Sequence, residues 1–465
     1  MRFITLIINF LFSNRLTGIL LFVFAISMAV ATFIENDFGT ETSKALIYSA
    51  KWFEIIIVIL GINFMGNIAK YNLFSWQKAP ILLLHLAFII IIIGAGITKY
   101  RGYEALVTIK EKENTNRILS IDSFLQLQAG NHHILRNYAP EPMLMSKIGF
   151  NSFNKKYDFE DQSIQVKLKE YIPNASKILV SSKNGSDFLH LVISNNNQRK
   201  EFNIKKGTRK NLYGLIIAFE TSNKLKDDIY IKATDSIYMV SFPSETSYFS
   251  MTENQSGMYP DNEFVPLKFK ALSNINNTPI VFTSVEKNKQ QKIIQNNNDP
   301  KIKNPESAIR LSITSGQDQK EITLFGGRGY MNPSTTVLLN NLHLKIRYGS
   351  KPIQLPFNIG LTDFTLERYP GSESPSAYYS ELQITDKKDT LDHQIFMNNV
   401  LDYKGFRFFQ SAYLPDESGT ILSINHDYWG TLVTYIGYAL LALGMMLNLL
   451  WNTRIFHFIS KPKLS

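Results

Sequence analysis

The chain has 465 residues, no cysteine, a formal net charge of +10 and a pI near 9.3. This length allows two or three domains and a sizeable core. The lack of cysteine excludes disulfides, a thiol nucleophile, Cys-ligated zinc or iron–sulfur sites and a CxxCH haem attachment on this chain. A net charge of +10 fits a nucleic-acid binder or a membrane protein, so the positions of the charges decide between these classes.

Four long apolar segments predict transmembrane helices over residues 16–34, 52–69, 79–98 and 429–451. Three of them contain no charged residue, and the second carries only Glu54, near its start. At 1.5 Å per residue, about 20 apolar residues cross a hydrocarbon core of about 30 Å. The four tryptophans lie at or near the ends of these segments, which is typical of a membrane interface. Buried helices of a soluble protein are the weaker alternative.

The short segments that flank these helices predict the orientation of the chain. The segments 1–15, 70–78 and 452–465 carry basic residues and no acid. By the positive-inside rule we expect both termini in the cytoplasm and residues 99–428 on the opposite side of the membrane. The alternative is a signal peptide cleaved after Ala29-Val30-Ala31. The apolar stretch is longer than the core of a usual signal peptide, and two more apolar segments follow closely, so an uncleaved helix is favoured.

Residues 99–428 predict a β-rich domain. In Ser163–Ile172, for example, apolar and polar residues alternate with the period of a half-buried strand. Similar short runs are separated by turn signals such as Asn184-Gly185. We therefore expect a large extracytoplasmic all-β domain, antiparallel and sandwich-like, between three transmembrane helices in residues 1–98 and a fourth helix with its tail in 429–465.

Two histidines are candidates for chemistry. His85 lies inside the third predicted helix, about 9 Å from its start, where an ionisable group is costly and is often functional. Neutral imidazole is also a common axial ligand of haem iron. The structural alternative is a hydrogen bond to Asn63 or Asn67 on the neighbouring helix. His426 precedes the fourth helix at the outer interface, where it could bind a ligand or contact lipid headgroups.

Other motifs are less specific. Gly430, Gly437 and Gly444 recur every seven residues down the fourth helix, which fits either close helix packing or a lipid-facing surface. The pair Asp227-Asp228 is typical of a solvated turn. The sequence contains no Walker phosphate loop, HExxH or GxSxG motif.

The arrangement of three apolar segments, a large β-rich region and one final apolar segment resembles the ResB (CcsB) family of cytochrome c biogenesis proteins. The resemblance is carried by specific stretches of sequence. They are ATFIENDFGTE (31–41), LLLHLAFIIIIIGAGIT (82–98), LPFNIGLTDFTLERYPGSESPSAYYSEL (355–382), IFMNNVLDYKGFRFFQSAY (395–413) and GTILSINHDYWGTLVTYIGY (419–438).

The resemblance implies a subunit of the system II cytochrome c synthase. Such a subunit works with a CcsA-type membrane protein to carry haem b across the membrane and present it to apocytochrome c. His85 matches the family's transmembrane histidine, a proposed axial ligand of the haem iron, and the opposing ligand would come from the partner. The tryptophan-rich haem-handling motif of the CcsA part is absent from this sequence, so we expect no complete catalytic activity from this chain alone. Two alternatives remain open: an extracytoplasmic binding or scaffold protein without a cofactor, and a haem-containing electron-transfer subunit.

Overall fold

The computed structural model describes residues 2–451 apart from 132, 196–197, 235–236, 252, 276 and 297–305, so the predicted basic tail from residue 452 lies outside the described residues. Among the described residues, four helices are long and apolar enough to cross a membrane. They are α2 (Asn14–Phe38), α4 (Lys51–Lys70), α5 (Ala79–Arg101, preceded by a short turn, Trp76–Lys78) and α6 (Tyr428–Leu450). They confirm the four predicted helices. The structure adds α1 (Arg2–Leu11), α3 (Thr40–Ser43) and a π-helical turn at Lys44–Tyr48, none of which the sequence analysis anticipated.

The strands confirm the predicted β-rich fold class and fall into two compact units. The main unit comprises Met1–Ala175 and Asn296–Ser465, and the inserted unit is Ser176–Gln295. The larger sheet of the main unit has the order β23-β22-β21-β2-β1-β26-β25-β24, with β20, β3 and β4 beside it. These strands are β1 (Tyr103–Lys110), β2 (Asn114–Gly130), β3 (Leu135–Asn137), β4 (Glu141–Pro142), β20 (Thr335–Leu339), β21 (Leu342–Arg368), β22 (Pro375–Asp386), β23 (Asp389–Ile395), β24 (Leu401–Tyr403), β25 (Phe406–Tyr413) and β26 (Gly419–His426). A four-stranded sheet has the order β19-β18-β6-β5 and consists of β5 (Asn154–Phe159), β6 (Gln162–Ile172), β18 (Ser307–Ser315) and β19 (Asp318–Gly326).

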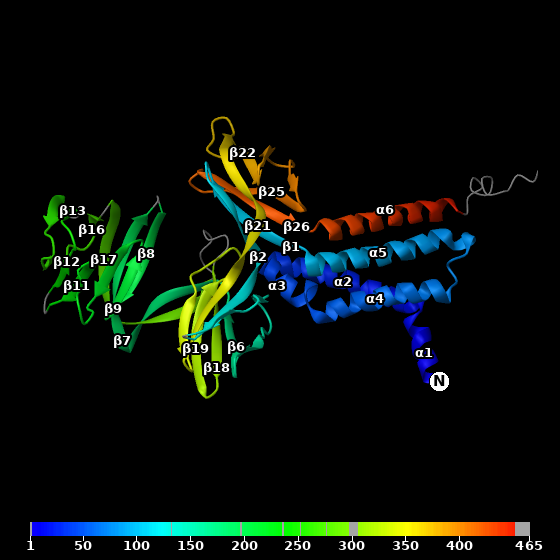
Figure 1. Cartoon of the computed structure of the whole chain (residues 1–465), viewed down its shortest axis with the longest axis horizontal. Coiled ribbons are helices and arrows are strands. Elements are labelled where there is room, and N and C mark those ends of the chain that lie inside the picture. Colours follow the sequence, from blue (N-terminus) through cyan, green and yellow to red (C-terminus); the bar gives the residue numbers. More distant parts are fainter. Residues whose placement is uncertain are drawn as a thin grey trace, which may run out of the picture. The chain divides into compact units, whose positions relative to one another are not determined.

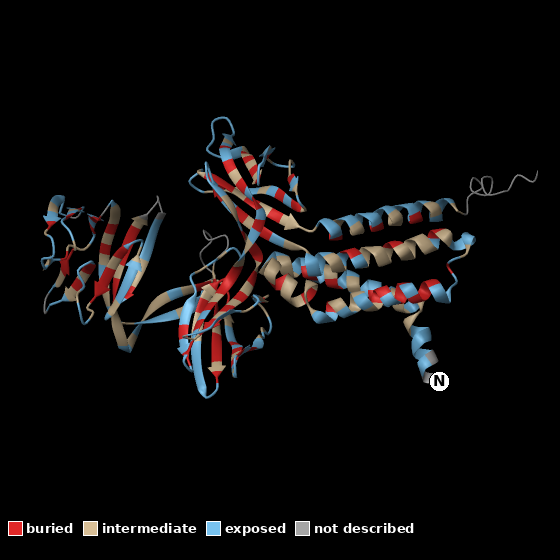
Figure 2. Cartoon of the chain, viewed as in Figure 1, coloured by how far each residue is buried: buried red, intermediate tan, exposed pale blue. Residues whose placement is uncertain are grey.

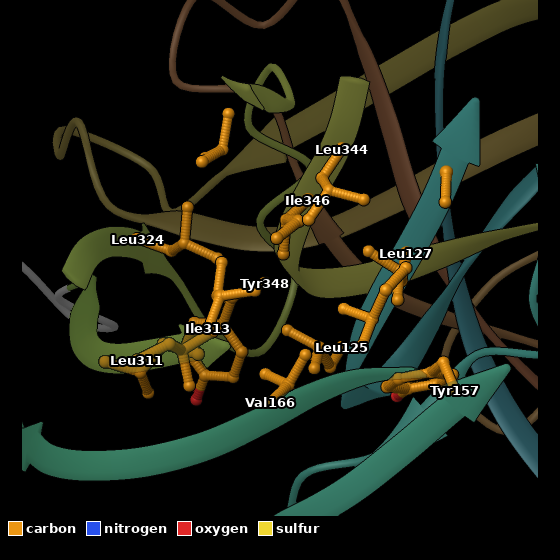
Figure 3. Packing of buried hydrophobic residues seen from close by; sticks show 14 of the residues in the cluster. Leu125, Leu127, Tyr157, Val166, Leu311, Ile313, Leu324, Leu344, Ile346 and Tyr348 are labelled. Atoms are coloured by element: carbon orange, nitrogen blue, oxygen red, sulfur yellow. The ribbon is translucent and has the colours of Figure 1, made fainter. Parts of the chain in front are cut away.

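The long strands β2 and β21 pair with each other and contribute to two separate cores. The first half of β21 places Leu344, Ile346 and Tyr348 in a core with β6 and β18, which Figure 3 shows from close by. The second half places Phe357 and Ile359 in a core with β1, β25 and β26. The register of the β2–β21 pair shifts between Leu119 and Ser123. A break in register of this kind lets a strand bend, so one pair of strands can contribute to both cores.

Helices α5 and α6 continue directly into a pair of strands (Figure 1). β1 starts two residues after the end of α5, and β26 ends two residues before the start of α6. These strands pair antiparallel, with Tyr103 opposite His426. At the junction the Thr98 hydroxyl donates to an Asp427 carboxylate oxygen at 2.6 Å. The end of α5 and the start of α6 are therefore fixed to the sheet by backbone pairing.

The glycines of α6 face α5. Gly430, Gly437 and Gly444 are the buried residues of an otherwise largely exposed helix (Figure 2). A Cβ atom at Gly437 would lie 2.6 Å from a side-chain carbon of Ile91, and one at Gly430 would lie 2.3 Å from the Thr98 hydroxyl. Of the two alternatives for this stripe, the structure shows close helix packing.

Within the main unit, the segment between α2 and α4 is bound to β2 and to the loop that follows β4. Thr42 and Ser43 are fully buried. The Ser123 hydroxyl donates to Glu41 at 3.2 Å, and the Lys147 backbone N–H donates to the Thr42 hydroxyl at 3.2 Å. The Lys44 ammonium lies 3.1 Å from Asp122. Polar contacts therefore join the helices to the sheet on this side.

The inserted unit has two sheets around its own apolar core. One has the order β15-β12-β11-β10-β9 and the other β14-β13-β16-β17-β7-β8. The strands are β7 (Ala175–Asn195), β8 (Gln198–Lys205), β9 (Thr208–Leu212), β10 (Leu215–Phe219), β11 (Asp228–Ala233), β12 (Tyr238–Ser241), β13 (Thr246–Ser250), β14 (Gln255–Tyr259), β15 (Val265–Pro266), β16 (Ala271–Ile275) and β17 (Thr278–Gln295). The β10–β11 pair is parallel, which departs from the predicted antiparallel pattern.

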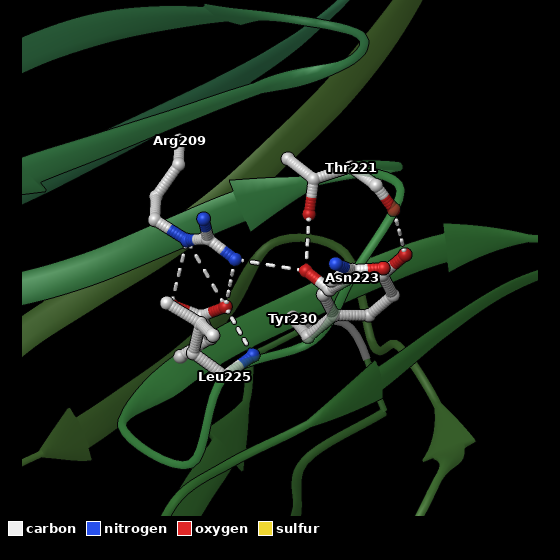
Figure 4. A network of polar contacts seen from close by, with 6 residues as sticks. Arg209, Thr221, Asn223, Leu225 and Tyr230 are labelled. Atoms are coloured by element: carbon white, nitrogen blue, oxygen red, sulfur yellow. Dashed lines mark hydrogen bonds and ion pairs between the residues drawn. The ribbon is translucent and has the colours of Figure 1, made fainter.

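Asp228 corrects one sequence-based interpretation. Its side chain is fully buried, not solvated, and it accepts two hydrogen bonds from Arg209 Nε and Nη2, at 2.9 and 2.7 Å (Figure 4). The Leu225 backbone N–H donates to the same carboxylate at 2.8 Å. A buried carboxylate needs such partners to offset its lost hydration. The network closes the loop between β10 and β11, which is a structural role.

Candidate functional site

His85 lies on α5, one turn after Ile81, and its ring orientation is set by its own helix. Its Nδ1 lies 2.9 Å from the Ile81 carbonyl oxygen. Because a carbonyl only accepts, this hydrogen bond places the proton on Nδ1 and leaves the lone pair on Nε2. A hydrogen bond from the non-ligating nitrogen to a carbonyl is also the usual support of a metal-bound histidine. His85 can therefore act as a neutral imidazole ligand through Nε2.

The aromatic ring of Phe64 packs against the His85 ring. The ring of Phe64, a buried residue of α4, meets it edge to face with centroids 5.5 Å apart, and Phe88 stacks on Phe64 at 5.0 Å. The His85 residue is itself only partly buried. This packing restricts the ring, while part of the residue stays accessible from outside the chain.

The amides of α4 are not the partners of His85. The Asn63 amide donates to the Leu11 carbonyl at 2.6 Å, and its oxygen accepts from the Thr17 hydroxyl at 2.6 Å. Asn67 donates to Thr17 and to Asn63 at 3.2 and 3.1 Å. Both asparagines therefore join α4 to α2 and to the segment before it. The alternative hydrogen bond considered for His85 is not formed with either of them.

His426 ends β26 and lies among aromatic rings. Its imidazole stacks on Tyr103 with centroids 4.9 Å apart and lies 4.3 Å from the Phe406 ring. It lines a cavity of about 320 Å³ together with Arg101, Lys404 and Trp429. This cavity combines basic groups and aromatic surface where α5 and α6 meet the sheet.

A second cavity of about 480 Å³ adjoins the turn between β24 and β25, which carries Lys404. It lies between the β24–β25 hairpin and the first turns of α6 and is lined by Lys404, Phe409 and Tyr435 among others. Lys404 contacts the Asp386 carboxylate, and hydrogen bonds from Lys404 and from the Tyr403 hydroxyl hold the pKa of Asp386 below its usual range. The two cavities share four lining residues, Lys404, Gly405, Asp427 and Tyr428. The sequence analysis singled out His426 but missed these basic neighbours, because strand pairing brings them together from distant segments.

The structure does not bring His85 and His426 together. His85 precedes Thr98 by 13 residues of α5, or about 20 Å. Thr98 contacts Asp427, the neighbour of His426. The two histidines therefore cannot ligate one iron atom. Within the described part of the chain no group of three or more His, Cys, Asp or Glu residues is placed to hold a metal ion.

Comparison with known proteins finds two similarities. Residues 322–421, from β19 to β26, match the model of the ResB-like family. The chain is 28% identical over 450 residues to Protein NrfI of Wolinella succinogenes, and this alignment covers 96% of the chain and 35% of the relative. The chain thus spans about a third of the length of the curated relative it matches. The resemblance to the ResB family is therefore confirmed, and residues 322–421 are the ResB-like segment of this chain.

Proposed function

We propose that the chain acts in cytochrome c biogenesis as a membrane subunit that holds haem during its delivery to apocytochrome c. In this proposal residues 99–428 lie on the outer face of a bacterial inner membrane and both termini lie in the cytoplasm. His85 Nε2 is an axial ligand of the haem iron, and a CcsA-type partner supplies the opposing ligand. The similarity to the ResB-like family and to Protein NrfI supports the biogenesis role.

The hydrogen bond from Nδ1 of His85 to the Ile81 carbonyl is the observation that carries this proposal. In the neutral ring it assigns the proton to Nδ1 and the lone pair to Nε2, so ligation requires no change of tautomer. Phe64 limits rotation of the ring from one side. The accessible part of the residue leaves room for a shared ligand. One histidine suits transient holding of haem, since a stable two-ligand site would need a second ligand from this chain.

His426 is a second candidate contact for the same substrate. Arg101 and Lys404 line its cavity, and their cations match the chemistry of the haem propionates. Because His426 lies about 20 Å further along the bundle, we assign it to a later step than His85. Loss of His426 should then lower cytochrome c maturation while haem held at His85 remains.

The test co-expresses the chain with its CcsA-type partner and compares the wild type with His85→Gly. We expect the variant complex to lose most of its copurified haem and its maturation activity, and added imidazole to restore part of the haem. His133→Gly, which removes an exposed histidine of the β2–β3 loop, is the matched control and should retain both. Unchanged haem and maturation in His85→Gly would favour a scaffold role and refute the ligand assignment. Stable, redox-active haem in the chain expressed alone would favour an electron-transfer subunit.

A further inference from the structure

Helix α1 is a short apolar helix outside the bundle. Its ten residues span about 15 Å, half of what a membrane crossing requires. The side chains of Ile4, Leu6, Ile7, Ile8 and Phe10 are 45–69% exposed. The polar residues Arg2, Thr5 and Asn9 follow one another at spacings of three and four, the period of a single helix face. The sequence of α1 is therefore amphipathic, and its apolar side has no cover within the described chain.

Side chains of α4 fix the point where α1 ends. Lys70 Nζ donates to the Asn9 carbonyl at 2.9 Å, and the Asn63 amide donates to the carbonyls of Leu11 and Ser13 at 2.6 and 3.3 Å. The last carbonyls of a helix have no partner within it, so these bonds stabilise its end. Ser13 then caps α2 by accepting a hydrogen bond from the Leu16 N–H at 3.2 Å.

The turn between the two helices is also closely packed. A Cβ atom at Gly66 would lie 2.0 Å from a ring carbon of Phe12. Gly66 is buried, as is Asn63, so this contact belongs to the interior of the bundle. The turn between α1 and α2 is therefore held by specific contacts with Asn63 and Gly66 of α4, and we call this turn the α1–α2 joint. Helix α1 is thus a separate helix and not a frayed extension of α2.

The neighbouring residues identify the level at which α1 leaves the bundle. Lys70 ends α4, and the connection to α5 carries Lys78 together with Phe74 and Trp76, which are 76% and 75% exposed. Basic residues beside exposed aromatic ones are typical of the headgroup region of a membrane. This end of the bundle is the one that the basic segments assign to the cytoplasm.

We propose that α1 lies along the cytoplasmic surface of the membrane, with its apolar face among the acyl chains and its polar face toward anionic headgroups. A helix too short to span, with one apolar face and basic neighbours, is suited to this position. In water its exposed side chains would form a contiguous apolar patch, and in lipid the same side chains are solvated. The α1–α2 joint then connects this surface helix to α2 and α4.

The absence of cysteine allows single reporters to be placed in the full-length chain. Ile7→Cys lies on the apolar face and Asn9→Cys on the polar face, about 160° apart around the helix. Each variant is labelled with an environment-sensitive fluorophore and reconstituted into vesicles of phosphatidylethanolamine and phosphatidylglycerol. We expect lipids brominated near the headgroup to quench the label at position 7 several-fold more than the label at position 9, and aqueous iodide to show the reverse order. Ile4→Cys is a second reporter for the apolar face.

Three results would overturn the proposal. Equal access of iodide to positions 4, 7 and 9 would mean that α1 stays in water. Shielding of positions 4 and 7 from both bromine and iodide would mean that protein covers the apolar face, and cross-linking of Ile7→Cys chains to each other would identify a second copy as the cover. Stronger quenching by deeply than by shallowly brominated lipids would place α1 inside the hydrocarbon core instead of on the surface.

Discussion

Different kinds of packing stabilise the helix bundle and the β-sheets. In the β units, large apolar side chains such as Tyr348 and Phe408 fill continuous cores. In the bundle, the α5–α6 contact depends on residues without a side chain, such as Gly437. Burial of apolar surface drives packing in water, whereas lipid solvates apolar helices as well as another helix does. The stability of the bundle therefore depends on the close approach of its helices and on a few polar contacts. The stability of the sheets depends on large side chains that fill the apolar cores.

Removal of a large side chain from a β core should give the largest effect. Phe408 of β25 is fully buried beside Phe357 and Phe406. Phe408→Ala should lower the free energy of unfolding by about 3–5 kcal/mol, because it removes buried surface and leaves a cavity. Chemical unfolding of the detergent-solubilised chain, followed by pulse proteolysis, measures this loss.

The adjacent residue is the matched control. Phe409 points to the other face of the same strand and is 38% exposed. Phe409→Ala should change the free energy of unfolding by about 0.5 kcal/mol or less. Equal losses in the two variants would show that filled volume does not set the stability of this unit.

Addition of one methyl group should give the next largest effect, and it acts in the bundle. In Gly437→Ala the new Cβ would lie 2.6 Å from Ile91 and 3.3 Å from the Ala87 carbonyl. The helices must then separate, at a cost of about 1–3 kcal/mol. Titration with a denaturing detergent, read by helical circular dichroism, should show an earlier transition for this variant.

Gly96→Ala is the control for this substitution. Gly96 also lies in a transmembrane helix, but nothing lies within 4 Å of its added Cβ. We expect its detergent transition to match that of the wild type. If Gly96→Ala and Gly437→Ala are equally destabilising, a general effect of helix substitution would explain the result, and close approach would not.

The same contrast explains how far the sequence predicts this fold. Long apolar segments identify the four helices, because spanning the bilayer imposes a length that local composition reveals. Alternation identifies strands such as β6, because one face is wet and the other is buried. The inserted unit and the parallel β10–β11 pair were not predicted, because they depend on pairings between distant segments.

The candidate site shows a similar limit. The cost of an imidazole at membrane depth makes His85 stand out in the sequence. Its hydrogen bond to Ile81 four residues earlier follows from helix geometry and could have been anticipated. The cavities near His426 could not, because Arg101, Lys404 and Trp429 come from α5, a hairpin turn and α6. The spacing of polar residues in the sequence reveals the polar face of α1. The separation of α1 from α2 could not be predicted, because it depends on contacts with Asn63 of α4.

A substitution at Glu41, where the helix bundle contacts β2, should change the free energy of unfolding least. Its effect should also depend on pH, because Glu41 is a buried titratable group. Glu41 accepts a hydrogen bond from Ser123, and burial raises the pKa of its carboxyl above the usual value of 4.5, against the opposing effects of Ser123, Arg328 and Lys147. Asp122 adds to the rise. The folded chain therefore binds this proton more tightly than the unfolded chain does.

Since the folded state holds more protons between pH 4.5 and the higher pKa of Glu41, its stability should fall as the pH rises through that interval. Glu41→Gln keeps the shape and the hydrogen-bond acceptor but removes the titration. We expect the variant to lose this slope and to exceed the wild type most at neutral pH, by less than the changes at Phe408 and Gly437. Unfolding free energies measured from pH 4 to 8 test this, and Ser123→Ala should steepen the slope because it removes a hydrogen bond that favours the carboxylate. Parallel pH profiles for the wild type and Glu41→Gln would contradict this prediction. They would show that packing alone stabilises the contact between the bundle and β2.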